Sequence, residues 1–150
     1  MDRFDREILA ELQDDARVSV TALADRVHLS VSACHRRLRD LETSGVIAAY
    51  RAQLDPAAVD LAFQAIVFVT MREGDSRILV EFETAVTEIE AVTDAQRLFG
   101  QPDYLLRVAT KDLDSFRLLY DETLGALPGV LRLSTTLVMK NLLQGRPLPL

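Results

Sequence analysis

Three amphipathic segments with clear start signals occupy residues 2–45, and their spacing is the feature that most restricts the fold. The first segment, residues 2–13, carries an apolar helical face made of Phe4, Ile8, Leu9 and Leu12. Ser19 and Ser30 are good N-caps for two further helices, and Gly45 is the residue type expected just after the last one. Roughly three residues separate these two helices, which is typical of a helix-turn-helix.

The third helix of this predicted motif combines a buried side with a basic outer side. Its expected buried line consists of Val31, Cys34, Leu38 and Leu41. Its outer face offers small residues near the start and arginines further along, which suit close approach to a DNA groove and contacts to phosphates or guanine edges. The candidate DNA-contacting residues are Ser19, Thr21, Ser30, Ser32, Ala33, His35, Arg36, Arg37 and Arg39. The alternative for the arginines is a solvated helix face.

The distribution of charge along the chain agrees with DNA binding, even though the net charge does not suggest it. The net charge is −6, yet Arg26 to Arg39 contains four arginines and no acidic residue. A basic patch on an acidic protein is compatible with selective DNA binding, because the acidic remainder repels DNA and reduces non-specific coating.

Several classes of protein are disfavoured. Cys34 is the only cysteine, so there is no intrachain disulfide, and it is expected to be a small buried core residue. Cys34 and His35 are neighbours that point about 100° apart on a helix, so we expect no metal site. Nucleophile elbows and phosphate-binding glycine loops are absent, which argues against an enzyme. Without a signal peptide or a membrane-spanning run, we expect a cytoplasmic protein with no membrane partner.

A boundary between two domains is expected near residues 51–60. Val46 to Leu54 has the character of an extended linker strand, and Asp55-Pro56 is a start signal for a short helix. We expect a helix-turn-helix domain over residues 1–50, a linker over 51–60, a second domain over 61–143 and a mobile tail over 144–150.

The second half predicts a β-α-β-β-α-β order. The expected elements are strand Phe63–Met71, helix Ser76–Glu88, strand Ala91–Phe99, strand Tyr104–Thr110, a helix capped by Asp112 and continuing to Leu127, and strand Val130–Met139. That order is the ferredoxin-like arrangement, in which both helices cover one face of a four-stranded antiparallel sheet. The fold class is therefore α+β, a winged-type helix-turn-helix followed by a ferredoxin-like domain.

The other face of this sheet has no cover within the chain. Phe63 to Met71 is nevertheless apolar on both sides, and a monomer would expose a large apolar patch. We infer that this face packs on a second copy and forms a two-fold dimer, which would let two recognition helices address two DNA half-sites.

An ordered set of motifs resembles the leucine-responsive and asparagine regulators, the Lrp/AsnC or feast/famine family. The set comprises Asp5 to Leu12, Val20 to Glu42, Ser44 to Ile47 with Tyr50, Leu54-Asp55-Pro56, Phe99 to Tyr104, Leu127 to Val130 and Thr135 to Lys140. Phe99 to Tyr104 resembles the family's Gly-x-x-Asp-Tyr turn. The chain departs from the family at His28 and Ala16, where glycine is common, and a non-glycine residue with positive φ is unusual.

The resemblance implies a transcription regulator with no cofactor other than a small effector, an amino acid. It also implies assembly of dimers into tetramers or octamers, with the effector bound between dimers near the Gly-x-x-Asp-Tyr turn. The effector residues that it implies are Gly100, Gln101, Pro102, Asp103, Tyr104, Ser134 and Thr136. Asp103 and Tyr104 have an alternative role, because aspartate suits turns and tyrosine suits strands.

We therefore expect a sequence-specific regulator of double-stranded DNA that responds to an amino acid. Two alternatives remain open. One is an architectural protein that wraps DNA with little effector control, and the other is an amino-acid sensor or small enzyme whose N-terminal helices serve protein contacts.

Overall fold

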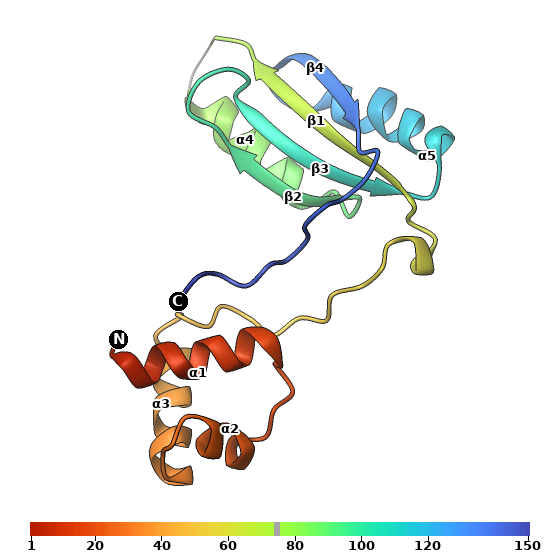
Figure 1. The fold of residues 1–150 in the computed structure, drawn as a ribbon. Helices are drawn as coiled ribbons and strands as arrows, with labels where there is room; N and C mark the ends of the chain where they lie inside the picture. The colour runs from red at the N-terminus through yellow and green to blue at the C-terminus, as the bar shows by residue number, and fades with distance from the viewer. Residues whose placement is uncertain (74–75) are drawn as a thin grey trace. The chain divides into compact units, whose positions relative to one another are not determined.

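The computed structural model describes residues 1–73 and 76–150, which form two compact units (Figure 1). One unit consists of Met1–Gln53 together with Leu143–Leu150, and the other of Leu54–Leu142. None of the helices in the described part of the chain has the length and apolar character that crossing a membrane requires.

Three helices build the first unit: α1 (Arg3–Asp14), α2 (Val20–Arg26) and α3 (Val31–Thr43). The helices α2 and α3 begin after Ser19 and Ser30 as predicted, and α1 begins after Asp2. The side chains of all three residues accept hydrogen bonds from backbone N–H groups in the first turns. All three helices contribute to one core, formed by Ile8, Leu23, Ala24, Val27, Cys34 and Leu41. The predicted helix-turn-helix and the buried position of Cys34 are confirmed.

The turn between α2 and α3 closes around His28, which has a φ of 54°. The Leu29 N–H then donates to the Ala24 carbonyl at 2.9 Å, which holds the start of α3 against the end of α2. Histidine thus takes the left-handed conformation for which glycine is better suited. One predicted core residue is wrong: Val31 is 47% exposed, because it occupies the first position of α3, at the edge of the small core.

Residues 46–54 do not form the predicted strand. Their sequence favours extended backbone, but a strand is defined by pairing and no neighbouring strand pairs with this segment in the described chain. The short helix predicted after Asp55-Pro56 is present as a 3-10 turn, η1 (Ala57–Val59). The tail over 144–150 lies against α1, where the Gln13 side chain donates to the Leu148 carbonyl and accepts from its N–H.

The second unit contains an antiparallel sheet with strand order β2-β3-β1-β4. Its strands are β1 (Phe63–Met71), β2 (Val92–Arg97), β3 (Tyr104–Thr110) and β4 (Val130–Leu137). The strands β2 and β4 are each about two residues shorter than expected at one or both ends. The ferredoxin-like arrangement is confirmed.

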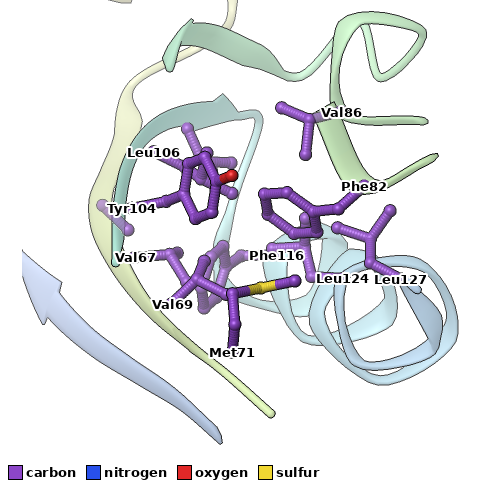
Figure 2. Close-up of a cluster of buried hydrophobic side chains, with 12 residues drawn as sticks. Val67, Val69, Met71, Phe82, Val86, Tyr104, Leu106, Phe116, Leu124 and Leu127 are labelled. Atoms are coloured by element: carbon purple, nitrogen blue, oxygen red, sulfur yellow. The ribbon is translucent and has the colours of Figure 1, made fainter. Parts of the chain in front are cut away.

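Two helical segments cover one face of this sheet, as Figure 1 shows. The first is α4 (Ser76–Thr87), and the second begins as α5 (Leu113–Leu118). The single helix predicted to reach Leu127 instead continues as a π-helical turn, Leu119–Thr123, and a 3-10 turn, Leu124–Ala126. Alternate residues of β1 and β3 point into the core between sheet and helices, where Phe82 packs on Tyr104 with ring centroids 4.6 Å apart (Figure 2).

On the opposite face of the sheet, no helix of the described residues lies over the strands. Ile66 and Phe68 of β1 lie there, half-buried, together with Leu105 of β3, which pairs with Phe68. On β4, Leu133 and Leu137 pair with the core residues Val69 and Ala65, so they do not belong to this face. The open face is thus an apolar strip flanked by polar side chains, narrower than the sequence predicts.

Candidate DNA-binding and effector sites

The start of α3 combines a side-chain cap with a small exposed surface. Ser30 accepts a hydrogen bond from the Ala33 N–H at 3.3 Å, and its hydroxyl lies 3.3 Å from that of Ser32. Ser32 and His35 are exposed and Ala33 is half-buried. Ser19 caps α2 through the Ala22 N–H, and Thr21 is exposed in the first turn of that helix. A groove-facing helix needs a small, polar first turn of this kind.

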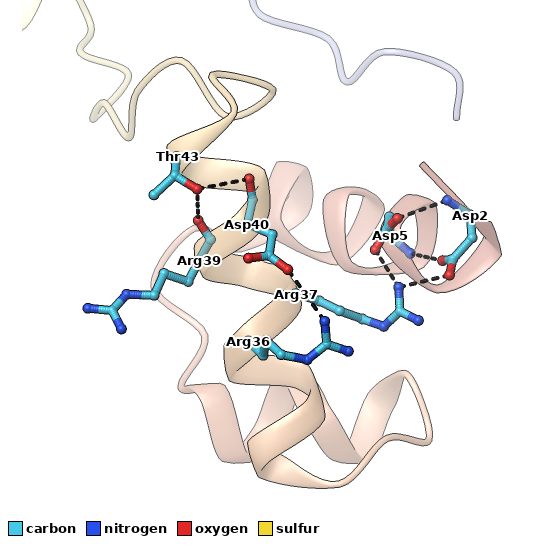
Figure 3. A network of polar contacts seen from close by, with 7 residues as sticks. All are labelled: Asp2, Asp5, Arg36, Arg37, Arg39, Asp40 and Thr43. Carbon is cyan, nitrogen blue, oxygen red and sulfur yellow. Dashed lines mark hydrogen bonds and ion pairs between the residues drawn. The ribbon is translucent and has the colours of Figure 1, made fainter.

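Arg36 and Arg39 are the two arginines of α3 that point into solvent. Arg36 lies 3.5 Å from Asp40, one turn further along, and both side chains are about two-thirds exposed. Arg39 forms no ion pair with any residue that the structure describes, and Figure 3 shows its side chain extending away from the rest of the network. An exposed ion pair such as Arg36–Asp40 contributes little, so both guanidinium groups are available to a phosphate or a base.

Arg37 lies apart from these two exposed arginines, and its role as a DNA contact stays a prediction. Its guanidinium lies 2.8 Å from the carboxylates of both Asp2 and Asp5, and only 22% of the side chain is exposed (Figure 3). It also lies over the Phe4 ring, 5.6 Å from the centroid. Hydrogen bonds to Asp5 and Asp2 raise the pKa of Arg37. Arg37 therefore joins α3 to α1.

The basic patch counted in the sequence is consequently smaller in the folded unit. Arg26 pairs with Glu11 of α1 at 2.9 Å, as Arg37 pairs with the acids at the start of that helix. Both acidic partners lie at least 15 positions away along the chain, so a count of charges within a short stretch of sequence misses them. Arg36 and Arg39 remain as the outward positive charge on α3.

The turn from Gly100 to Asp103 joins β2 to β3 and is fastened to the end of β1. Gly100 has a φ of 122°, which glycine tolerates best. The Asp103 N–H donates to the Val69 carbonyl at 2.9 Å, and the Asp103 carboxylate accepts from the Met71 N–H at 2.7 Å. Asp103 thus shapes the hairpin, the alternative role noted in the sequence, while Gln101 is exposed and Pro102 half-buried beside it.

The remaining predicted effector residues lie on two different faces of the sheet. Tyr104 pairs with Val69 and is 3% exposed, so its side chain points toward α4. Ser134 pairs with Phe68 and Thr136 with Ile66, so both point to the open face. Successive residues of a strand point to opposite faces. Within one chain, the structure therefore does not bring Ser134 and Thr136 together with Tyr104.

Two charged residues that the sequence did not single out lie beside Tyr104. The Tyr104 hydroxyl donates to the Glu83 carboxylate at 2.7 Å, and Arg97 lies 3.4 Å from the same oxygen. Burial, followed by the hydrogen bond to Glu83, raises the pKa of Tyr104 to about 12. Glu83 directly follows the core residue Phe82 on α4. This position next to a buried residue is the sequence feature that could have marked Glu83 as part of a site.

Comparisons with known proteins cover both units. The family model described as Lrp/AsnC ligand binding domain matches residues 64–148, and the model described as winged helix-turn-helix DNA-binding matches residues 1–48. The leucine-responsive regulatory protein of Escherichia coli is 38% identical over 148 residues, 99% of this chain and 90% of that protein.

Solved structures agree over the whole chain. A transcriptional regulator from Neisseria meningitidis, determined as an L-Met complex, is 33% identical with a TM-score of 0.93 and covers 99% of this chain and 96% of its own. An AsnC family transcriptional regulator from Agrobacterium tumefaciens is 32% identical with a TM-score of 0.92, over 99% of this chain and 97% of its own. These matches span the DNA-binding and the ligand-binding parts together, and the chain belongs to the Lrp/AsnC family of transcriptional regulators.

Proposed function

We propose that this regulator recognises specific double-stranded DNA sequences through α3 and that an amino acid controls its action. The observation that carries the DNA part is the outer surface of α3, where Arg36 and Arg39 are exposed beside the small first turn. The capped N-terminus of α3 leaves polar backbone and hydroxyl groups at the point where the helix would enter a groove.

A DNA selection experiment tests this proposal. Protein would be used to enrich sites from a pool of random-sequence duplexes, and the enriched site would then be measured by fluorescence anisotropy. We expect Arg36→Ala and Arg39→Ala each to weaken binding and to reduce the slope of log affinity against log salt by about 0.9 if a phosphate contact is lost. Arg17→Ala, an exposed arginine between α1 and α2, is the matched control. Wild-type affinity in both α3 variants would contradict the assignment of α3.

The effector part is supported by the ligand-binding family match and by the structural neighbour whose complex contains L-Met. The candidate positions are the exposed Gly100 and Gln101, with Pro102, Asp103 and Tyr104 after them. A thermal-shift screen with each common amino acid tests it, since a ligand at 100 times its Kd stabilises the folded protein by about 2.7 kcal/mol. We expect one chemical group of amino acids to raise the Tm.

Assembly into two-fold dimers is proposed from the open face of the sheet. Ile66, Phe68 and Leu105 form an apolar strip there, and none of the helices that the structure describes covers it. Pairing this face with that of a second copy would remove the strip from water. In such a dimer Ser134 and Thr136 of each copy would lie at the shared face, and higher assembly into tetramers or octamers would build on it.

An architectural role in wrapping DNA remains the second candidate function. It would be favoured by a selection that enriches no sequence, and by a footprint that extends with protein concentration and does not change with any amino acid. In either role the target is chromosomal DNA, so we place the working protein in the cytoplasm, with no cofactor beyond the effector.

A further inference from the structure

A cavity of about 320 Å³ lies beneath the outer edge of the sheet, between α4 and β2. Its lining residues are Phe82, Glu83, Val86, Thr87, Ala95, Arg97, Tyr104 and Leu106. The strand residues belong to the helix-covered face, because Ala95 pairs with Leu106 and Arg97 with Tyr104. The cavity exists because β2 is an edge strand whose central residue toward α4 is an alanine, which leaves the space between strand and helix unfilled.

The inner wall of this cavity is apolar and preformed. Phe82, Leu106 and Val86 are each no more than 3% exposed, and they are held by the core of the unit (Figure 2). The volume is at the lower end of the range for small-molecule sites, roughly 300–1,000 Å³. A ligand that fits this volume could place one short apolar group against the wall.

The mouth of the cavity carries one negative and one positive charge. Glu83 and Arg97 face each other there at 3.4 Å, with side chains that are 44% and 60% exposed. Tyr104 donates to Glu83 Oε1, the oxygen nearest Arg97, at 2.7 Å. Within the described part of the chain no donor reaches the other oxygen, Oε2. The carboxylate is thus held in position by Tyr104 and retains a free acceptor.

We propose that this cavity binds a free α-amino acid with an apolar side chain, a step that rests on the amino-acid control proposed above. The ammonium group would be accepted by Glu83, the carboxylate would pair with Arg97, and the side chain would lie beside Ala95, against the small exposed edges of Phe82 and Val86. Such charge-assisted contacts are the stronger class of hydrogen bonds. The site differs from the turn at Gly100–Asp103, and Tyr104 is the residue common to both.

The pair of charges selects this chemical class over simpler ligands. A lone amine would leave Arg97 without a new partner, and a lone carboxylate would face Glu83 at close range. A side chain with its own charge would have to lie against an apolar wall without a partner, which is costly. An α-amino acid supplies both charges on one carbon, with the apolar group beside them.

The experiment is isothermal titration of the full-length protein with L-leucine, L-methionine, L-valine and L-phenylalanine. Analogues of the tightest binder that lack one charge follow; for leucine these are 4-methylpentanoate and 3-methylbutylamine. The variants are Ala95→Leu, which fills the cavity without changing charge, and Arg97→Gln and Glu83→Gln at its mouth. Glu81→Gln on the exposed side of α4 and Arg117→Gln on α5 are the matched controls. Circular dichroism melts report whether each variant is folded.

We expect Ala95→Leu, Arg97→Gln and Glu83→Gln each to raise Kd by at least ~10-fold, with the controls unchanged and both analogues binding far more weakly. Arg97→Gln and Glu83→Gln change exposed groups, so they keep the test valid if Ala95→Leu does not fold. Retained binding in the three cavity variants, with loss in Gln101→Ala, would overturn this site and leave the amino-acid control standing at the turn. A wild-type protein that binds its DNA site but none of the four amino acids would overturn this site, whereas the amino-acid control falls only if no common amino acid raises the Tm in the thermal-shift screen.

Discussion

The Arg37 guanidinium of α3 lies 2.8 Å from the Asp5 carboxylate of α1, and Asp5 is in turn part of the cap that begins α1. Asp2 and Asp5 each accept a hydrogen bond from the other's backbone N–H, so one ion-paired group connects the cap of the first helix to the middle of the third. Only 16% of the Asp5 side chain is exposed, so this ion pair is better shielded from water than a surface ion pair.

Replacing Arg37 should therefore affect stability first. In Arg37→Ala, Asp2 and Asp5 would face each other without a cation, and we expect the Tm to fall by several degrees. Arg37→Lys should recover part of the loss, because a lysine keeps the charge but lacks the planar fork that reaches two carboxylates. The measurement is a circular dichroism melt with Arg17→Ala as the control. A wild-type Tm combined with weaker DNA binding would instead support Arg37 as a DNA contact.

The same cap predicts a specific loss of stability in acid. The hydrogen bond from the Asp5 N–H, with a further contribution from Arg37, lowers the pKa of Asp2 below 3.8. A carboxyl whose pKa is lower in the folded state stabilises the protein above its unfolded pKa and loses that contribution as the pH falls through the folded value. Asparagine at position 2 can still cap the helix but does not titrate.

We therefore expect the Tm of the wild type to fall more steeply than that of Asp2→Asn as the pH drops below about 5. Above that pH the wild type should be the more stable of the two, because it retains the ion pair with Arg37. Parallel curves of Tm against pH would show that the cap carboxylate does not contribute.

Much of the fold could be predicted from the sequence because its determinants are local. Short runs rich in apolar residues place β1 and β3 at their observed bounds, and Ser19 and Ser30 mark the starts of two helices. The same reasoning fails for residues 46–54, where an extended propensity has no strand to pair with.

The candidate sites were harder to predict from the sequence, because they depend on residues that lie far apart along the chain. Arg37 and Asp5 are 32 positions apart, and their pairing follows from how α3 packs on α1. Glu83 and Arg97 meet only because α4 crosses the edge strand. The conformation of Asp103 shows the same limit, since its N–H and its carboxylate bond to backbone groups of β1, far from the turn along the chain.

The open face of the sheet predicts how the assembly can be broken. Phe68 lies at the centre of the apolar strip, paired with Leu105 on one side and Ser134 on the other. We expect Phe68→Asp to convert dimers to monomers, because burial of an unpaired carboxylate in the shared face is strongly unfavourable. Val80→Asp, at a 60% exposed apolar position of α4, is the matched control. Sedimentation velocity measures the outcome, and a Phe68→Asp protein with the wild-type sedimentation coefficient would refute this interface.

Tyr104 predicts a loss of stability in alkali. Burial and the hydrogen bond to Glu83 raise its pKa to about 12, above the ordinary value of 10.0. The neutral phenol is therefore favoured in the folded state, so its contribution is complete below pH 10 and is lost as the pH rises through about 12. Tyr104→Phe should remove this dependence and lower the stability at neutral pH by about 1 kcal/mol through the lost hydrogen bond.

The measurement is urea unfolding at several pH values, together with the absorbance of ionised tyrosine. Tyr50, whose pKa is also raised to about 12 by burial and by Glu42, provides a comparison in the other unit through Tyr50→Phe. If the absorbance change near pH 12 is undiminished in Tyr104→Phe, the phenol does not titrate as its surroundings predict.

A comparison of Gly45 with Gly129 distinguishes two ways in which replacing a glycine lowers stability: backbone strain and overpacking of the core. Both have positive φ, 76° and 71°, so alanine at either position is strained in the backbone by about 1 kcal/mol. A Cβ at position 45 would meet open space, whereas at position 129 it would overlap the Ile78 side chain of α4 and come within 3.0 Å of Met71. Gly129 precedes β4, and its carbonyl accepts from the Arg72 N–H at 2.8 Å, so the backbone there cannot move freely away from the helix.

We expect Gly129→Ala to cost about 2–4 kcal/mol in total, the additional part being overpacking of the core, and Gly45→Ala to cost only the backbone strain. Urea unfolding of both variants measures the difference, and equal losses would mean that α4 shifts to accommodate the added methyl group.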